Sequence, residues 1–254
     1  MCPLLGESFV SEVVFVGTSD AFGAGGRRQS AVFVRAERGG MLFDCGATTN
    51  TGLAQLGISR EEIDVLLISH FHGDHFGGIP AFLYASYYID ARRHPIEIVG
   101  PPDIEERVHQ LADAMGHHLR DREWPFPIRF REIHPEEALS VGPAEIQAFA
   151  TQHQPDANPQ GYRVRLGREQ IAYSGDTGWF EDLPRQIAGS DLFICECTLH
   201  QAGLDFHLSL DELREHRDDL DCGRLTLTHL GNDMANQRGQ LEIETADDGM
   251  VIKL

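Results

Sequence analysis

Apolar runs of strand length alternate with stretches of helical period along most of this chain. In the first half the apolar runs predict strands at 12–16, 30–35, 41–44, 64–69 and 96–99. Apolar positions three and four residues apart predict helices at 48–56, 79–92 and 103–115. Ser59 and Glu62 have the spacing of a capping box and predict a short helix between them. His109, His117 and His118 lie away from any metal-ligand spacing and are expected at the surface.

The second half is richer in strands. Apolar runs predict them at 128–133, 144–151, 161–166, 170–173, 191–196 and 224–228. Helices are predicted at 180–187 and at 208–218, with Ser209 as the N-cap of the second. Two last strands, 241–245 and 250–254, flank Asp247-Asp-Gly249, a turn signal that predicts a hairpin.

The alternation of strands and helices occurs in two blocks, and no Pro/Ser-rich linker separates them. We therefore predict one domain over residues 1–254, built of two similar halves. Its fold class is α/β, a four-layer αβ/βα sandwich of two mixed β-sheets with helices outside. A chain of 254 residues with 41% apolar content is long enough for a sizeable core.

Charge and cysteine content narrow the expected partners. The formal net charge is −19, from 40 acidic and 21 basic residues, so large nucleic acids are poor expected partners. No apolar run is long enough to span a membrane, and the N-terminus lacks the pattern of a signal peptide. Five scattered cysteines fit free thiols in a reducing cytoplasm, and Cys195 and Cys197 are expected to be buried small apolar residues. A homodimer is compatible with the sequence, which does not locate an interface.

A glycine-rich loop, 21–30, follows the first predicted strand. It has neither the Gly-x-Gly-x-x-Gly pattern of dinucleotide sites nor a Gly-Lys-Ser/Thr phosphate loop, so neither site is predicted. Arg27 and Arg28 lie in this loop. Contact with an anionic substrate and simple solvation both remain open for these two side chains.

The densest chemistry of the chain is the segment His70-Phe-His-Gly-Asp-His75, directly after the predicted strand 64–69. It has three imidazoles and one carboxylate in six positions. Burying so many polar groups without partners costs several kcal/mol. A metal site is therefore the better explanation.

Further potential ligands follow later strands, and together they suffice for two ions. One ion would be held by His70, His72 and His153, and the other by Asp74, His75 and His229, with Asp176 between the two. Two such ions would hold a hydroxide between them that attacks the substrate. Imidazole-rich ligation favours zinc, with manganese or iron as substitutes.

This pattern resembles the metallo-β-lactamase superfamily, whose ligand set is His-x-His-x-Asp-His followed by His, Asp and His. All seven positions have a match here, over nearly the whole chain. Gly73 within the motif, the segment Tyr173-Ser-Gly-Asp-Thr177, the opening Gly17-Thr-Ser and the closing 246–250 segment look most like the branch of tRNase Z and related phosphodiesterases. His72 disfavours an oxygen-reducing role, because flavodiiron relatives commonly have Glu there. His75 disfavours β-lactamase activity.

The resemblance also implies proton-transfer residues. Glu196 and His207 look like the Glu and His that the phosphodiesterase branch uses to protonate a leaving group. Asp74 and Asp44 are candidates for orienting imidazoles or handling protons. For Asp44 a purely structural place at a strand end is an equal alternative, and for His207 an exposed place beside a helix cap.

We therefore expect a cytoplasmic, dinuclear metal-dependent hydrolase of small anionic phosphodiesters such as cyclic nucleotides. Alternatives are hydrolysis of a lactone or sulfate ester, redox chemistry on iron, a metal-binding regulatory module without turnover, and tRNA 3′-processing. The last is disfavoured because tRNase Z enzymes usually have a long Gly/basic arm between the positions of His153 and Asp176. That interval is too short here for an arm.

Overall fold

The computed structural model describes residues 11–37 and 39–254. The expectation about a signal peptide falls on residues outside this range. Seven strands form a first sheet in the order β14-β1-β2-β3-β4-β5-β6. Their bounds are Val251–Lys253 for β14, Glu12–Gly17, Ala31–Arg35, Gly40–Phe43, Val65–Leu67, Ile96–Gly100 and Ile128–Glu132.

A second sheet of seven strands has the order β13-β12-β11-β10-β9-β8-β7. From β7 to β13 the bounds are Ala138–Val141, Ala144–Ala150, Gln160–Leu166, Glu169–Tyr173, Ser190–Glu196, Cys222–Thr228 and Glu244–Thr245. Both sheets are mixed, because β3 to β6 and β10 to β13 pair in parallel while their other neighbours are antiparallel.

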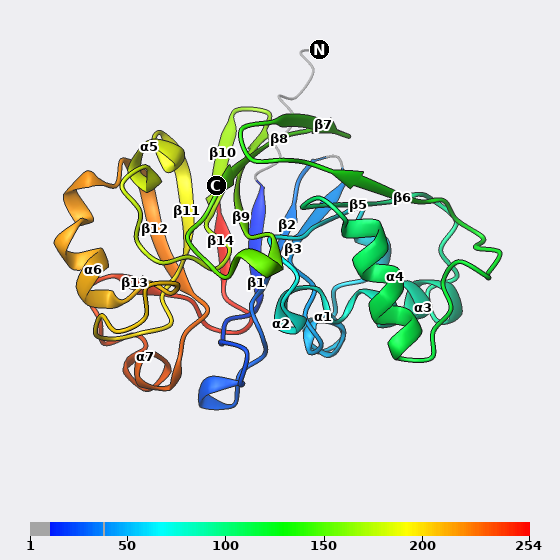
Figure 1. Cartoon of the computed structure of the whole chain (residues 1–254), viewed down its shortest axis with the longest axis horizontal. Coiled ribbons are helices and arrows are strands. Elements are labelled where there is room, and N and C mark those ends of the chain that lie inside the picture. Colours follow the sequence, from blue (N-terminus) through cyan, green and yellow to red (C-terminus); the bar gives the residue numbers. More distant parts are fainter. Residues whose placement is uncertain (1–10, 38) are drawn as a thin grey trace, which may run out of the picture.

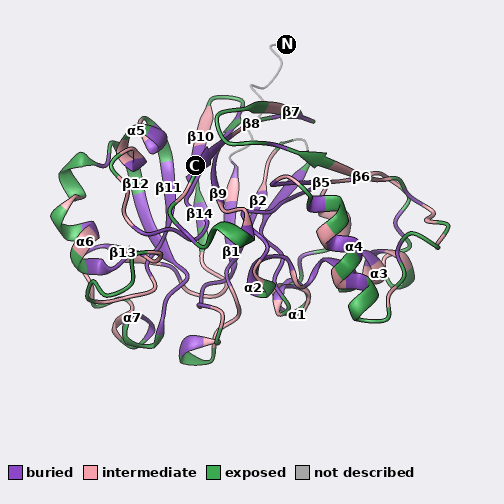
Figure 2. Ribbon diagram, viewed as in Figure 1, coloured by how far each residue is buried: buried purple, intermediate pink, exposed green. Residues whose placement is uncertain are grey.

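Helices cover the outer face of each sheet (Figure 1). The first half contributes α1 to α4, which are Thr49–Leu56, Gly73–Phe76, Ile79–Tyr88 and Ile104–Ala114. The second contributes α5 to α7, which are Leu183–Ile187, Leu210–Glu215 and Asn232–Gln237. Figure 2 shows buried residues along the strands and exposed ones on the outward turns of α4 and α6. None of the helices within 11–37 and 39–254 is long and apolar enough to cross a membrane.

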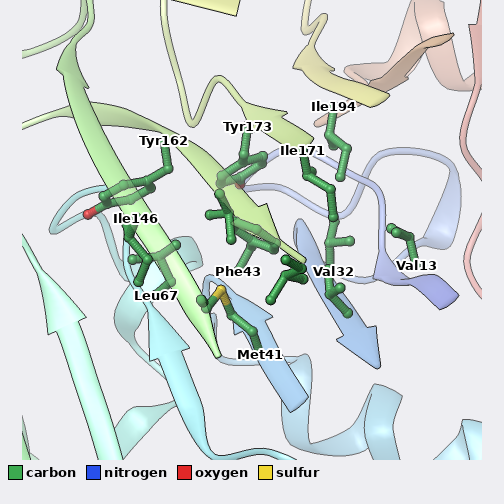
Figure 3. Packing of buried hydrophobic residues seen from close by; sticks show 14 of the residues in the cluster. Val13, Val32, Met41, Phe43, Leu67, Ile146, Tyr162, Ile171, Tyr173 and Ile194 are labelled. Carbon is green, nitrogen blue, oxygen red and sulfur yellow. The ribbon is translucent and has the colours of Figure 1, made fainter. Parts of the chain in front are cut away.

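Strand alternation explains the layers. In β1, Val13 and Phe15 point into the cluster between the sheets, while Val14 and Val16 belong to the cluster under the helices of the first half. Figure 3 shows side chains of both sheets meeting in the central layer, among them Phe43 and Tyr173. A third cluster lies between the second sheet and α5 to α7. The predicted four-layer α/β sandwich is thus confirmed.

The hairpin predicted around Asp247-Asp-Gly249 is wrong. β13 pairs with β12 of the second sheet, and β14 pairs with β1 of the first. The turn itself forms, since the Met250 amide donates to the Asp247 carbonyl. Its two sides diverge because the strand before the turn belongs to the second sheet and the strand after it belongs to the first.

The surface position predicted for His109 is also wrong. α4 packs beside β6, and this puts the His109 ring 5.7 Å from the ring of Phe130. The side chain is buried, and burial lowers its pKa. His118, in contrast, is exposed as predicted.

Two helix starts follow the local signals that the sequence contains. Ser209 and Glu212 form a capping box at α6, and Ser59 and Glu62 form another at the short 3-10 helix Arg60–Glu62. The predicted helix at 79–92 is shorter and ends with α3 at Tyr88. Cys45, Cys195, Cys197 and Cys222 are free thiols, and the first three are buried.

Candidate metal centre

The seven predicted ligands converge where strands of both sheets end. His70 and His72 follow β4, and Asp74 and His75 lie in α2. The other three follow second-sheet strands: His153 after β8, Asp176 after β10 and His229 after β12. The structure therefore joins ligands from both halves, although 81 positions separate His72 from His153.

Gly175 makes the close approach of the two sheets possible. Its φ is +57°, and an added Cβ would lie 2.8 Å from Cβ of Ser69. The glycine lets the end of β10 approach the segment that precedes His70. Asp176 follows directly and faces the histidines.

The side chains form two groups that share Asp176. We call His70, His72, His153 and Asp176 the first cluster, and Asp74, His75, Asp176 and His229 the second cluster. Within each cluster one ligand atom of every residue lies within 4.8 Å of the others. The sequence analysis divided the residues in the same way, and their role as ligands stays a prediction.

Distances place Asp176 between the clusters. Its Oδ2 lies 3.8 Å from Nε2 of His70 and 3.9 Å from Nε2 of His153. Towards the second cluster, Oδ1 lies 3.3 Å from Nε2 of His75, and Oδ2 lies 3.4 Å from Nε2 of His229. One carboxylate thus faces both sets of imidazoles.

Hydrogen bonds fix which nitrogen of each imidazole points inward. Nδ1 of His153 donates to the Phe206 carbonyl at 2.8 Å, and Nδ1 of His75 donates to Asp44 at 2.7 Å. Thr198 Oγ1 donates to Glu196, so it accepts from Nδ1 of His229 at 2.8 Å. Nε2 of each of these three histidines is thereby aimed into the site, where it can bind a metal ion once it has lost its proton.

The nitrogen and oxygen atoms that face inward fit metal ions. Nδ1 of His72 lies 3.0 Å from Nε2 of His70 and 3.1 Å from Nε2 of His153. In the second cluster, His75 Nε2 and Asp176 Oδ1 are buried without a hydrogen-bond partner. Buried polar atoms without partners are rare in proteins, and a divalent cation would satisfy these.

The electrostatics of the second cluster point the same way. Burial lowers the pKa of His229, but Asp176 and the hydrogen bond to Asp74 outweigh it and raise the pKa to about 9. Burial raises the pKa of Asp176, yet His229 and His75 hold it well below its usual range. His75 and His229 lower the pKa of Asp74 against burial in the same way, so Asp74 and Asp176 stay charged and can attract a bound cation.

Asp44 lies behind the second cluster and orients it. Asp44 directly follows β3, its side chain is buried, and its φ is +59°. Its carboxylate accepts from the Ser69 amide, the Ser69 hydroxyl and the Tyr173 hydroxyl as well as from His75. Of the two alternatives for Asp44, the orienting one therefore has geometric support.

Glu196 and His207 form the predicted pair beside the clusters. Nδ1 of His207 donates to Oε1 of Glu196 at 2.7 Å. Burial lowers the pKa of His207, but Glu196 outweighs it, and the net pKa is raised. The His207 ring stacks on His229 with centroids 5.5 Å apart and meets the ring of His153 at 5.0 Å. The imidazole therefore lies where both clusters can be reached.

Thr198 is a site residue that sequence reasoning missed. Its hydroxyl donates to Oε2 of Glu196 at 2.8 Å and accepts from His229, and so links the proton-transfer pair to the second cluster. The only feature of the sequence that could have indicated a role for Thr198 is its position directly after Cys195-Glu-Cys197. A threonine at a strand end is too common for that place alone to indicate a role.

The two arginines of the glycine-rich loop have partners within the protein. Arg27 pairs with Asp247 at 2.7 Å. Arg28 donates from Nε to the Val16 carbonyl at 2.6 Å and lies 3.5 Å from Asp248. Both side chains thus hold the loop against the turn before β14.

Comparison with known proteins identifies the family. A family model described as Anti-Pycsar protein Apyc1 matches residues 11–248. The chain belongs to this family.

Other relatives connect the family to ribonuclease Z. The protein is 26% identical to ribonuclease Z of Methanothermobacter thermautotrophicus over 302 positions, 96% of each chain. It is 38% identical to ribonuclease Z of Halorubrum lacusprofundi over 151 residues, 59% of this chain and 46% of that one. Zinc phosphodiesterase ELAC protein 1 of Mus musculus is 33% identical over 168 residues, 64% of this chain and 44% of its own. The chain thus spans about half the length of the last two.

Solved structures also relate this chain to tRNase Z. The short form of human tRNase Z is 27% identical and superposes with a TM-score of 0.77 over 95% of this chain and 98% of that one. The metallo-β-lactamase fold protein YhfI of Bacillus subtilis is 22% identical, with a TM-score of 0.77 over 96% of this chain and 100% of its own, and shows the shared fold. The predicted superfamily and branch are confirmed.

Proposed function

We propose that this protein is a dinuclear metal-dependent phosphodiesterase of small phosphodiesters such as cyclic nucleotides. The observation that supports this most directly is the Glu196–His207 pair beside the two clusters, in which Nδ1 of His207 lies 2.7 Å from Oε1 of Glu196. Cleaving a phosphodiester of an ordinary alcohol releases an alkoxide, which needs a proton. A lactone or sulfate ester with a good leaving group needs this pair less.

Bound divalent ions supply a water activated at neutral pH and offset the charge that develops on the phosphate oxygens. The first and second clusters would each hold one ion. The imidazole-rich donor set favours zinc over manganese or iron. The mouse relative is named a zinc phosphodiesterase, which also supports zinc.

The chain's own residues deliver the proton. Glu196 is fixed by the Thr177 amide at 2.9 Å, the Thr198 amide at 3.1 Å and the Thr198 hydroxyl. It accepts Nδ1–H of His207 and so stabilises the imidazolium. The opposite nitrogen, Nε2, then holds a proton for the departing oxygen. His207 is 15% exposed, which lets a substrate reach it.

A substrate panel with the metal-loaded protein tests this proposal. We expect turnover of cyclic nucleotides and chromogenic phosphodiesters. His72→Ala and Asp176→Ala should abolish both metal binding and turnover. His118→Ala, in the exposed segment that follows α4, should change neither. Hydrolysis of lactones or sulfate esters with untouched phosphodiesters would show that the substrate class is wrong.

A second candidate is tRNA 3′-processing, favoured by the relatives named ribonuclease Z. Against it, residues 154–175 are filled by a 3-10 turn, β9 and β10, which leaves no arm of the kind expected for tRNA. The net charge of −19 also opposes binding of a polyanion. Cleavage of precursor tRNA with a higher kcat/KM than that for cyclic nucleotides would favour this second candidate.

A further inference from the structure

Phe22 is the most exposed large apolar side chain among residues 11–37 and 39–254. It is 92% exposed at the tip of the glycine-rich loop, while the next in order, Ile89, is 74% exposed. Leaving a phenyl ring in water forfeits the stabilisation that burying it would give. A phenyl ring exposed in this way is suited to binding a ligand or another molecule.

The loop that presents Phe22 is held in one shape. Oδ1 of Asp20 accepts hydrogen bonds from the amides of Phe22 at 3.0 Å and Ala24 at 3.2 Å. Ala24 is buried in the apolar cluster that includes Met234 of α7. Gly23 and Gly25 take the left-handed backbone conformation that the tight turn requires. The ring is therefore presented by a fixed support.

One side of this support is joined to the second cluster through His229. The amide of Asp20 donates to the carbonyl of Leu230, and the amide of Leu230 donates to the carbonyl of Thr18. Leu230 directly follows His229. The loop thus begins at the same strand end as this candidate ligand.

The other side of the loop packs beside Gly46, whose backbone lies against that of Asp74. Nε2 of Gln29 donates to the Ala21 carbonyl at 3.1 Å. Oε1 of Gln29 lies against Gly46, where an added Cβ would meet it at 2.9 Å and the Asp74 carbonyl at 1.9 Å. Phe22 therefore stands on a loop whose start is hydrogen-bonded to the backbone next to His229 and whose end packs beside Gly46.

A hollow of about 480 Å³ lies beside Asp20, directly before the loop, and leaves room for an organic group. It begins at Thr198, which hydrogen-bonds His229, and continues along α7. Its polar wall residues include Asp20, Thr198, His200, Asn232, Asp233 and Gln237. These side chains can hydrogen-bond the edge of a heterocycle, whereas the acidic ones would repel a second phosphate.

We propose that Phe22 is a specificity-determining residue that stacks on the planar base of a nucleotide phosphodiester whose phosphate lies at the two clusters. This inference rests on the proposed phosphodiesterase function. A neutral stacking contact suits a chain of net charge −19, because the protein as a whole offers an anionic substrate little electrostatic attraction.

The test compares a substrate that has a base with one that does not. Wild type, Phe22→Ala and Phe22→Trp would be assayed on adenosine 3′,5′-cyclic phosphate and on base-free 1-O-methylribose 3′,5′-cyclic phosphate. Stacking of a base on an aromatic side chain is worth about 1–3 kcal/mol. We expect Phe22→Ala to lower the ratio of the two kcat/KM values about tenfold or more, mainly through KM, and Phe22→Trp to restore it.

Ile89→Ala is the matched control, because Ile89 is also exposed but follows α3, outside the clusters, and should leave the ratio as in wild type. Equal losses on both esters with Phe22→Ala would overturn the stacking role. So would an unchanged ratio together with a lower sedimentation coefficient, which would make Phe22 a contact between copies of the chain. If wild type hydrolyses neither ester, the proposed function fails and this inference fails with it.

Discussion

The hydroxyl of Tyr173 donates a hydrogen bond of 2.6 Å to Oδ2 of Asp44, and this bond joins the two sheets directly behind the second cluster. Tyr173 ends β10 and Asp44 follows β3. Burial and the charge of Asp44 raise the pKa of the phenol well above its usual range, so the hydroxyl remains a donor throughout the neutral range.

Removing this hydroxyl should cost stability. Tyr173→Phe leaves the ring in the central layer but deprives a buried carboxylate of one donor, so we expect the free energy of unfolding to fall by about 1.5–3 kcal/mol. Urea denaturation of the purified variant measures this. Tyr88→Phe is a suitable control because Tyr88 is 63% exposed. A loss no larger than that of the control would mean that the bond contributes little.

Asp44 should strengthen metal binding. Asp44→Asn keeps the size of the side chain and tolerates the φ of +59°, but it removes the charge that faces Nδ1–H of His75. Loss of such a carboxylate partner typically weakens metal binding 10–100-fold. Competition with a chromogenic chelator would report this, with exposed Asp113→Asn as the control. Unchanged affinity would contradict the orienting role of Asp44.

The Glu196–His207 pair predicts a dependence on the leaving group. His207→Ala should lower kcat about 10²–10⁴-fold for esters of ordinary alcohols, because their oxygen needs a proton to depart. The loss should be much smaller for p-nitrophenyl esters, whose phenolate leaves unprotonated. Elemental analysis should show that the metal content is retained. Equal losses on both ester types would point to damage of the site instead of a missing acid.

Glu97 gives a dependence of stability on pH. Burial raises its pKa, but hydrogen bonds from Arg131 and Arg129 outweigh this, and the net pKa is lowered. A lowered folded-state pKa means that the stabilisation is complete well above the unfolded value of about 4.3 and is lost as the pH falls through the folded value. Glu97→Gln should therefore be less stable than wild type at pH 7, and the difference should shrink below about pH 4.

Denaturation curves at several pH values would measure this difference. Exposed Glu181→Gln is the control and should follow wild type throughout. A gap between wild type and Glu97→Gln that stays constant from pH 7 to pH 3 would show that the ion pairs with Arg129 and Arg131 do not contribute.

The sequence was most informative where chemistry and position coincide. His70 to His75 sit at a strand exit, and His153, Asp176 and His229 follow strands that a period of two or a buried apolar run identifies. Strand ends of one sheet edge meet in space, so convergence could be predicted. The pairing of Glu196 with His207 followed from the resemblance to a family.

Long-range partners were not accessible in the same way. β13 and β14 each pair with a strand far away in sequence, so the local turn signal at Asp247 could not show that they separate. α7 consists largely of polar residues, and only Met234 and Ala235 are buried, so its helix depends on packing that no short window contains. Thr198 and Tyr173 act through hydrogen bonds to residues of other strands, which periodicity does not report.

The connection between β6 and β7 has a practical consequence. Residues 134–137 are exposed, and they divide the chain so that His70, His72, Asp74 and His75 lie on one fragment and His153, Asp176 and His229 on the other. β14, which belongs to the second fragment, completes the sheet of the first. A nick at this connection would therefore produce two inactive polypeptides whose reassociation restores turnover. The two fragments could therefore serve as a split reporter. Each would be fused to one of two proteins of interest, and turnover would report that these two proteins bind each other.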